Sequence, residues 1–179
     1  MAEGDREARF EALYEVAFRR VLAYALRRAD SPEDAADVVA ETFAIAWRRL
    51  DDVPTDDRAV LWLYATARRV LANEIRRRRR RSALVERLGA ELATAVPPVT
   101  AGRDPDRLTE ALALRQLKEE DRELLMLAGW EGLDADELSS LLGCSAAAVR
   151  IRLHRARRRL AAQMDSAAAA PKYEPLSGH

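Results

Sequence analysis

The chain of 179 residues contains little cysteine, histidine or glycine and has no long apolar run. Its single cysteine, Cys144, cannot form an internal disulfide, and with only two histidines it provides no metal-ligand set. Seven glycines leave little room for a phosphate-binding loop, and no nucleophile elbow or paired-histidine motif occurs. No apolar stretch reaches the length of a membrane span or a signal-peptide core. We therefore expect a cytoplasmic protein without a membrane segment, a metal or a cofactor, and not an enzyme.

The charged residues are abundant but unevenly distributed. Thirty basic and thirty acidic residues give a formal net charge of zero. The basic side chains gather at residues 68–69, 76–81 and 150–159, whereas acidic side chains gather at residues 33–41 and 51–57. This segregation predicts two different partners for the chain.

The most informative pattern lies between Gly132 and Leu160. Asp134 and Glu137 have the spacing of a capping box, which predicts the start of a short helix. Gly143 can adopt the left-handed conformation that ends a helix, and Ser145 can cap the next one. The apolar face of that next helix consists of Val149, Leu153, Ala156 and Leu160. Its other faces carry arginines and no acid, so the pattern predicts a helix-turn-helix for the DNA major groove.

Helical patterns also fill the earlier part of the chain. Apolar residues at three- and four-residue steps predict helices over residues 10–25, from Pro32 to about residue 50, and over residues 58–75. Proline directly after Ser31 is typical of a capped helix start. Two further helical segments, residues 108–117 and 121–130, lead into the helix-turn-helix. We expect all three tryptophans in the core: Trp47, Trp62 and Trp130.

These patterns predict an all-α protein, with two small helical domains joined by a flexible linker. The predicted parts are an N-terminal helical bundle (1–81), the linker (82–106), the helix-turn-helix domain (107–164) and a disordered tail (165–179). The linker is predicted from its prolines, with a short helix possible over residues 84–92, and the tail from its prolines and alanine run.

Three stretches of the chain carry a family resemblance. They are residues 34–43 with Trp47 following, residues 62–68, and residues 121–125 running into Gly132 and the 149–156 helix. In this order they resemble the sigma factors of the extracytoplasmic-function group of the sigma-70 family, over residues 10–81 and 107–163. The resemblance implies a protein that binds core RNA polymerase and directs promoter-specific transcription initiation. It also implies an anti-sigma factor as a partner.

In this group an acidic helix of the first domain docks on the clamp of the largest polymerase subunit. By motif position, the resemblance assigns this contact to Asp34, Asp37, Glu41, Thr42 and Phe43. The spacing of the three acids independently places their carboxylates on one helix face. Such a stripe is more often a solvated face with no partner, and the surrounding motif favours docking. Ala40 stands where the group usually has glutamine.

The third helix and the loop 51–57 correspond to the group's promoter-melting and minus-ten elements. There the loop helps to capture a base flipped from the nontemplate strand. The expected DNA contacts are Arg68, Arg69, Asn73, Arg76 and Arg77. Arg69 and Asn73 stand where asparagine and aspartate are common. For residues 76–81, a solvated helix end is an equally good interpretation, and we favour Arg76 and Arg77 over the later arginines.

The second helix of the helix-turn-helix corresponds to the reader of the minus-thirty-five element in promoter DNA. The candidates are Ser145, Ala147, Arg150, Ile151, Arg152, His154, Arg155 and Arg158. Arg150 is the candidate for reading a base, because a bidentate arginine on guanine is the commonest specific contact. Arg152, Arg155 and Arg158 are better suited to phosphates, and the cap residue Ser145 can also donate to one. We expect His154 to be a neutral surface side chain.

Two other functions are compatible with a helix-turn-helix. The first is a repressor or activator whose first domain senses a ligand or forms a dimer. Such a domain does not need the second arginine cluster. The other is a decoy for the polymerase clamp that has lost DNA binding, and the intact basic helix argues against it.

Overall fold

The structure, a computed structural model, describes residues 3–87 and 112–169. Every secondary-structure element within these ranges is helical, which confirms the predicted all-α class. The chain divides into two compact units, Met1–Pro98 and Val99–His179. Over the two described stretches, no helix combines the length and the apolar character that a membrane crossing needs.

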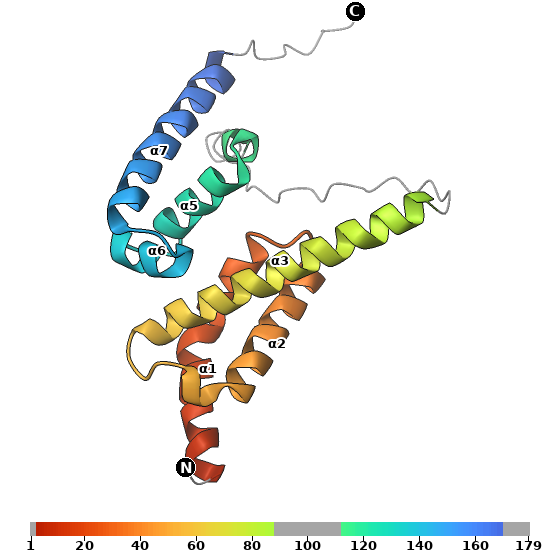
Figure 1. Cartoon of the computed structure of the whole chain (residues 1–179), viewed down its shortest axis with the longest axis vertical. Helices are drawn as coiled ribbons and strands as arrows, with labels where there is room; N and C mark the ends of the chain where they lie inside the picture. Colours follow the sequence, from red (N-terminus) through yellow and green to blue (C-terminus); the bar gives the residue numbers. More distant parts are fainter. Residues whose placement is uncertain (1–2, 88–111, 170–179) are drawn as a thin grey trace, which may run out of the picture. The chain divides into compact units, whose positions relative to one another are not determined.

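The first unit is built from three long helices. These are α1 (Glu3–Leu26), α2 (Pro32–Arg48) and α3 (Arg58–Arg87), with a short 3-10 turn, η1 (Leu50–Asp52), after α2. Each long helix contacts the other two, and α3 lies across the α1 and α2 pair (Figure 1). At the start of α2 the Ser31 hydroxyl accepts a hydrogen bond from the Asp34 backbone N–H at 3.1 Å. The predicted cap with proline at the first helical position is thus confirmed.

The core of the first unit joins aliphatic and aromatic side chains from all three helices. Val21, Tyr24, Val38 and Leu63 are among its fully buried members. An aromatic cluster connects α1 to α2, in which the Phe43 and Tyr14 ring centroids lie 4.8 Å apart. Burial of these large side chains provides most of the driving force that holds the three helices together.

Two of the three tryptophans do not belong to the core, contrary to the prediction. Trp47 lies in the last turn of α2 and is 37 % exposed. Phe10 of α1 packs edge-on against it, with the two ring centroids 5.2 Å apart. Trp130 is 50 % exposed and directly follows α5. Trp62 is half-buried on α3.

The third helix is longer than predicted. It continues through the arginine run and includes residues 82–87, which were assigned to the linker. Arginine has a high helix propensity, and Arg78 is fixed to the start of α2 by ion pairs with Asp30 and Asp34. In Figure 1 the arginine-rich end of α3 extends past α2. The rest of the predicted linker, residues 88–106, lies outside the described residues.

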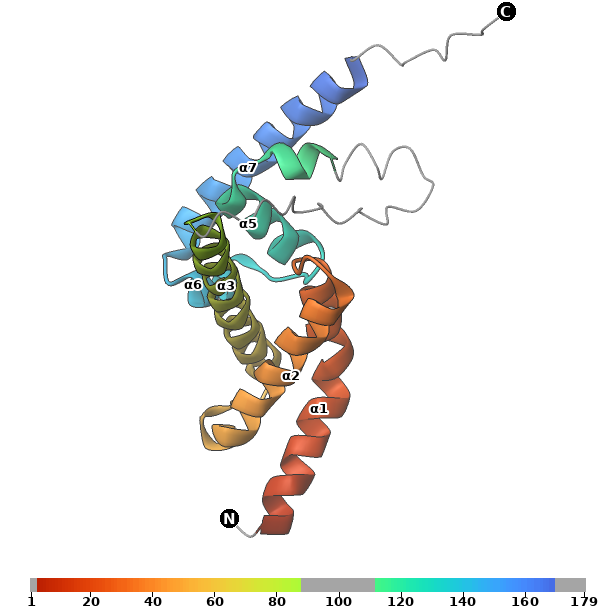
Figure 2. The same ribbon diagram turned by 90° about the vertical axis from the view of Figure 1, so that its right-hand side faces the viewer.

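The second unit contains α5 (Glu119–Gly129), α6 (Ala135–Leu142) and α7 (Ala146–Ala169), preceded by helical residues 112–116. Both α5 and α6 contact α7, and they lie beside its N-terminal half (Figure 2). Leu127, Leu138, Val149 and Ala156 form the fully buried centre of this unit.

The turn between α6 and α7 has the predicted helix-turn-helix chemistry. Asp134 accepts a hydrogen bond from the Glu137 backbone N–H at 2.9 Å, and Glu137 accepts one from the Asp134 N–H at 2.8 Å. Gly143 ends α6 with a left-handed φ of 66°. The Ser145 hydroxyl accepts from the Ala148 N–H at 3.2 Å at the start of α7. The capping box, the left-handed glycine and the serine cap are all confirmed.

The last helix also continues beyond its predicted end. Residues 165–169, which were assigned to the disordered tail, belong to α7. Three of them, residues 167–169, are alanines, and alanine has the highest helix propensity. The tail residues 170–179 lie outside the described residues.

Candidate functional site

A row of carboxylates lies on the exposed side of α2. Asp37 and Glu41 are exposed, and Asp34 is half-buried. Arg78 of α3 pairs with Asp34 and also donates to Asp30 at 2.7 Å. The hydrogen bond from Arg78 holds the pKa of Asp34 below its ordinary value of 3.8, because it stabilises the charged form of the carboxyl.

Thr42 and Phe43 do not belong to this acidic face. Thr42 is fully buried and its hydroxyl donates to the Val38 carbonyl oxygen at 2.6 Å. Phe43 is 5 % exposed and packs in the aromatic cluster. Thr42 follows Glu41 by one helical step of about 100° and Phe43 by two steps, about 200°, which turns both inward. Their assignment to a partner contact is therefore corrected: in the folded unit they are packing residues.

An outward row of polar side chains follows α3. Arg69, Asn73, Arg76 and Arg80 are all exposed, and their spacing of three and four residues places them on one face. Arg76 donates to the Asn73 side-chain oxygen at 2.5 Å, which aligns the two side chains along the helix. We call these four residues the α3 outer row.

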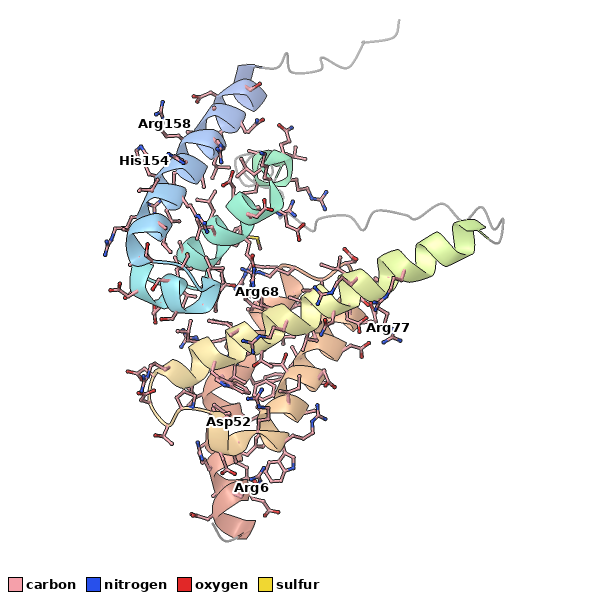
Figure 3. The ribbon with its side chains drawn as sticks, viewed as in Figure 1. Arg6, Asp52, Arg68, Arg77, His154 and Arg158 are labelled. Atoms are coloured by element: carbon pink, nitrogen blue, oxygen red, sulfur yellow. The ribbon has the colours of Figure 1, made fainter. Side chains whose placement is uncertain are left out.

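The other arginines of α3 point in different directions. Arg77 is exposed beside the outer row and lies 3.4 Å from Glu74, whereas Arg68 is half-buried. Figure 3 shows both along the helix, with Arg77 towards its far end. Arg78 turns to α2 as described above. The structure thus brings Arg69, Asn73 and Arg76 together, with Arg77 at the margin and Arg68 off the row.

Two acids of the loop 51–57 are paired with nearby arginines. Arg49 lies 2.8 Å from Asp52, and Arg58 lies 2.8 Å from Asp56. The hydrogen bond from Arg58 lowers the pKa of Asp56. Asp56 also accepts from the Arg58 backbone N–H at 3.1 Å, where α3 begins. The pairs reduce the negative charge that this loop presents to its surroundings.

The solvent-facing side of α7 is basic over residues 150–159. Val149, Leu153 and Ala156 face the interior, as predicted. The predicted candidates on the exposed side are Ser145, Ala147, Arg150, Ile151, Arg152, His154, Arg155 and Arg158, all of which are exposed. Figure 3 shows His154 and Arg158 projecting from the side of α7 that faces away from α5. No acidic residue occurs between positions 146 and 164, so this face is strongly cationic.

Two arginines of α7 have structural contacts within the unit. Arg152 approaches the Cys144 sulfur at 3.8 Å. Arg159 pairs with Asp121 at 2.5 Å and thereby fastens α7 to α5. Arg150, Arg155 and Arg158 point outward and take part in neither of these two contacts. Their positions agree best with a DNA-facing surface.

Three arginines with long-range contacts were missed by sequence reasoning. Arg6 and Arg9 lie in the first turns of α1, before the predicted helix start at residue 10. Arg6 contacts the last turn of α2 and Asp51 after it, and Arg9 contacts Val53. Arg78 was included in a run treated as a helix end. Arg78 follows Ile75 by three residues and Glu74 by four. This helical phase was the available signal that its side chain faces α2.

Comparison with known proteins assigns both units to one family. The model of Sigma-70 region 2 matches residues 13–81, and that of Sigma-70, region 4 matches residues 111–160. The chain is 34 % identical over 155 residues to the RNA polymerase sigma factor CnrH of Cupriavidus metallidurans, covering 81 % of each chain. It is 31 % identical over 156 residues to the ECF RNA polymerase sigma factor SigL of Mycobacterium tuberculosis, covering 86 % of this chain and 87 % of SigL. The chain belongs to the extracytoplasmic-function sigma factors.

Solved structures of sigma factors have the same fold. The sigma factor RpoE of Bartonella quintana, solved with the anti-sigma factor NepR, matches with a TM-score of 0.68 at 23 % identity, over 87 % of this chain and 96 % of that one. CnrH, solved with the cytosolic domain of CnrY, matches with a TM-score of 0.62 at 26 % identity over 88 % of both chains. This sigma factor therefore directs transcription by RNA polymerase, and α7 with α6 forms the helix-turn-helix of its region 4. The matches span both units, which favours this function over a separate repressor or activator.

Proposed function

We propose that the two units of this sigma factor carry out separate parts of promoter recognition. The first, within residues 1–81, binds core polymerase and reads the minus-ten element, and the second, within residues 107–164, reads the minus-thirty-five element. The observation that carries the proposal is that α2 presents exposed carboxylates, whereas the exposed α3 outer row lies on the side of α3 opposite to Arg78, which bonds Asp34 of α2. One face suits a basic protein surface and the other suits DNA. The sigma factor would act in the cytoplasm, without catalytic chemistry of its own.

The polymerase contact is proposed for Asp34, Asp37 and Glu41. A basic surface on the clamp of the largest polymerase subunit would complement these three carboxylates and speed the encounter. Asp34 is already paired with Arg78, so docking there would exchange an internal ion pair for an external one. Glu41 also pairs with the exposed Arg48 at 2.9 Å, so it too would exchange partners, and the exposed Asp37 is the main new contact.

The minus-ten contact is proposed for the α3 outer row and the loop 51–57. Arg69 and Arg76 would bind strand phosphates, and Asn73 between them can donate and accept at a base edge. The exposed end of the loop, residues 55–57, would receive a base flipped from the stack.

The minus-thirty-five contact is proposed for the outward face of α7. Arg150 would read a guanine, and Ile151, which is 53 % exposed, could contact a thymine methyl group. Arg155 and Arg158 would bind phosphates on either side of the groove. Ser145 and the N-terminus of α7 would add a further phosphate contact.

We also propose an anti-sigma factor as a partner. RpoE of Bartonella quintana was solved with the anti-sigma factor NepR, and CnrH with the cytosolic domain of CnrY. An inhibitor that covered the acidic face of α2 would compete with polymerase, since both need Asp37 and Glu41.

The test is run-off transcription with bacterial core RNA polymerase on a pool of upstream genomic fragments, with and without the chain. Transcripts that depend on the chain are expected, and they would reveal the promoter motif. Specific duplex binding by the chain alone, with no dependent transcript, would contradict the proposal and favour a repressor or activator.

A further inference from the structure

The first turns of α1 are bonded to the segment that leads from α2 into the loop 51–57. Arg6 donates to the Trp47 carbonyl oxygen at 2.5 Å and lies 3.6 Å from the Asp51 carboxylate. Arg9 donates to the Val53 carbonyl oxygen at 2.5 Å. In Figure 3, Arg6 and Asp52 lie in the same region of the first unit. Two arginines of one helix thus bind three points of a segment more than forty residues away in the chain.

The same segment is fixed from the core side by its own side chains. Leu50 is 1 % exposed and Val53 is 3 % exposed. At Val53 the side chain is held in the core while the carbonyl oxygen is held by Arg9. The residues that follow, 55–57, are exposed. The loop therefore has a rigid base and a solvent-facing end, an arrangement that holds a binding loop in one conformation.

We propose that Arg6 and Arg9 are positioning residues for minus-ten recognition, which set the loop 51–57 in the conformation that captures the flipped base. The inference rests on the proposed role of that loop. A guanidinium suits this task because its fork of donors can bind two acceptors at once, and its hydrogen bonds to carbonyl groups are charge-assisted. A loop ordered before binding does not lose that conformational entropy when DNA arrives.

Arg6 has a second effect on the same loop. With Arg6 on Asp51, Arg49 on Asp52 and Arg58 on Asp56, three of the loop's acids have an arginine partner. An acidic loop without these partners would repel the phosphates of the strand that it has to approach. Removal of Arg6 therefore both loosens the loop and increases its negative charge.

The experiment uses the full chain reconstituted with core polymerase on a promoter found by the run-off assay. The minus-ten element of the template is randomised, and sequencing of the transcripts gives the base preference at each position. The test variant is Arg6→Ala/Arg9→Ala, and the matched control is Arg19→Ala, an exposed arginine of the same helix. A third variant inserts two glycines after Thr55, which alters the exposed end of the loop and leaves both arginines in place.

The double variant is expected to lose base preference by about tenfold at one or two minus-ten positions, because a small misplacement of a positioning group has effects of this size or larger. Its affinity for core polymerase and its transcription from a template already open across the minus-ten region are expected to match those of Arg19→Ala. Arg9→Lys, which keeps a donor for the Val53 carbonyl, is expected to retain most of the preference.

Each other result overturns the inference in an identifiable way. If the glycine insertion abolishes base preference while the double variant keeps it, the loop role stands and the positioning role of Arg6 and Arg9 is wrong. If the insertion leaves the preference intact, the proposed loop function fails, and the inference fails with it. If the double variant loses polymerase binding and open-template transcription to the same extent as base preference, the two arginines only stabilise the fold.

Discussion

Arg78 connects the two surfaces of the first unit for which we propose different partners. It belongs to the arginine-rich part of α3, yet its guanidinium bonds Asp30 and Asp34 next to the acidic face of α2. An arginine from the helix proposed to bind DNA thus helps to hold in place a carboxylate proposed to bind polymerase. This link makes the stability of the first unit dependent on pH.

Arg78→Ala is expected to lower the free energy of unfolding by about 1 kcal/mol near pH 7, the upper end for ion pairs that solvent reaches. The folded-state pKa of Asp34 lies below its ordinary value of 3.8, mainly because of the Arg78 hydrogen bond. As pH falls, the Asp34 carboxyl therefore takes up a proton in the unfolded chain before it does so in the folded chain. The stabilisation from the Arg78 pair is fully present above the ordinary pKa of 3.8 and is lost as pH falls through the lower folded-state pKa. Urea unfolding at neutral and acidic pH measures this, and a difference between variants that is equal at both would contradict the role of Asp34.

A second prediction distinguishes the exposed Asp37 and Glu41 from the buried Thr42. Asp37→Asn/Glu41→Gln is expected to weaken core-polymerase binding by about fivefold, and more at low salt, because exposed complementary charges mainly affect the encounter. Thr42→Val is expected to leave this affinity unchanged and to cost about 1 kcal/mol of stability, since it removes one buried hydrogen bond. A fluorescence titration with core polymerase gives both affinities. Reduced binding by folded Thr42→Val would restore Thr42 to the contact.

On the outward face of α7, we expect Arg150 to read a base and Arg155 to bind a phosphate. Arg150→Ala is expected to relax the base preference at one minus-thirty-five position, worth about 1 to 3 kcal/mol of discrimination. Arg155→Ala is expected to weaken binding about equally for all sequences and to reduce its salt dependence. Competition binding of holoenzyme to promoters with single substitutions distinguishes the two. Equal loss on all sequences for Arg150→Ala would make it a phosphate contact.

The turn between α6 and α7 depends on one left-handed residue. Gly143 has φ of 66° and a Cβ added there would have no atom within 4 Å, so Gly143→Ala changes only the backbone energy. The expected cost is about 1 kcal/mol. Gly129→Ala is the matched control, because Gly129 is helical and also has open space around it; it is expected to stabilise the unit slightly. Thermal unfolding of the full chain compares them, and equal shifts would exclude a conformational cause.

Local signals predicted some elements well and others only in part. The capping box and Gly143 lie within a few residues of the bonds they form, so α6 and the start of α7 were predictable. The ends of α3 and α7 were not. In α3 the arginine run is typical of a helix end; the helical phase of Arg78 indicates an inward side, but its partners near the start of α2 are not visible in the local pattern. In α7, the composition after residue 164 is typical of disorder, but the helix continues to Ala169 because alanine has the highest helix propensity.

The presence of one basic surface on each unit gives a test on the whole protein. Two triple variants each replace three arginines with neutral glutamines. The α3 variant is Arg69→Gln/Arg76→Gln/Arg77→Gln, and the α7 variant is Arg152→Gln/Arg155→Gln/Arg158→Gln. Each is expected to reduce the slope of log Kd against log salt for holoenzyme on promoter DNA by about two to three, if all three residues contact phosphates. Filter binding or anisotropy across a salt series measures the slope. An unchanged slope for the α3 variant would mean that only the second unit binds DNA.

The family and the overall class of this protein follow from the sequence, because helix periodicity, caps and short motifs are local properties of the chain. Sequence also indicated which face of α7 is basic, since one helix sets its own faces. Burial needed the tertiary structure: Thr42 and Phe43 share a motif with Asp37 and Glu41, and only the packing of α1 on α2 shows that they are inside. The same is true of Arg6 and Arg9. Their contacts join residues more than forty positions apart, and such contacts exist only after the helices have packed.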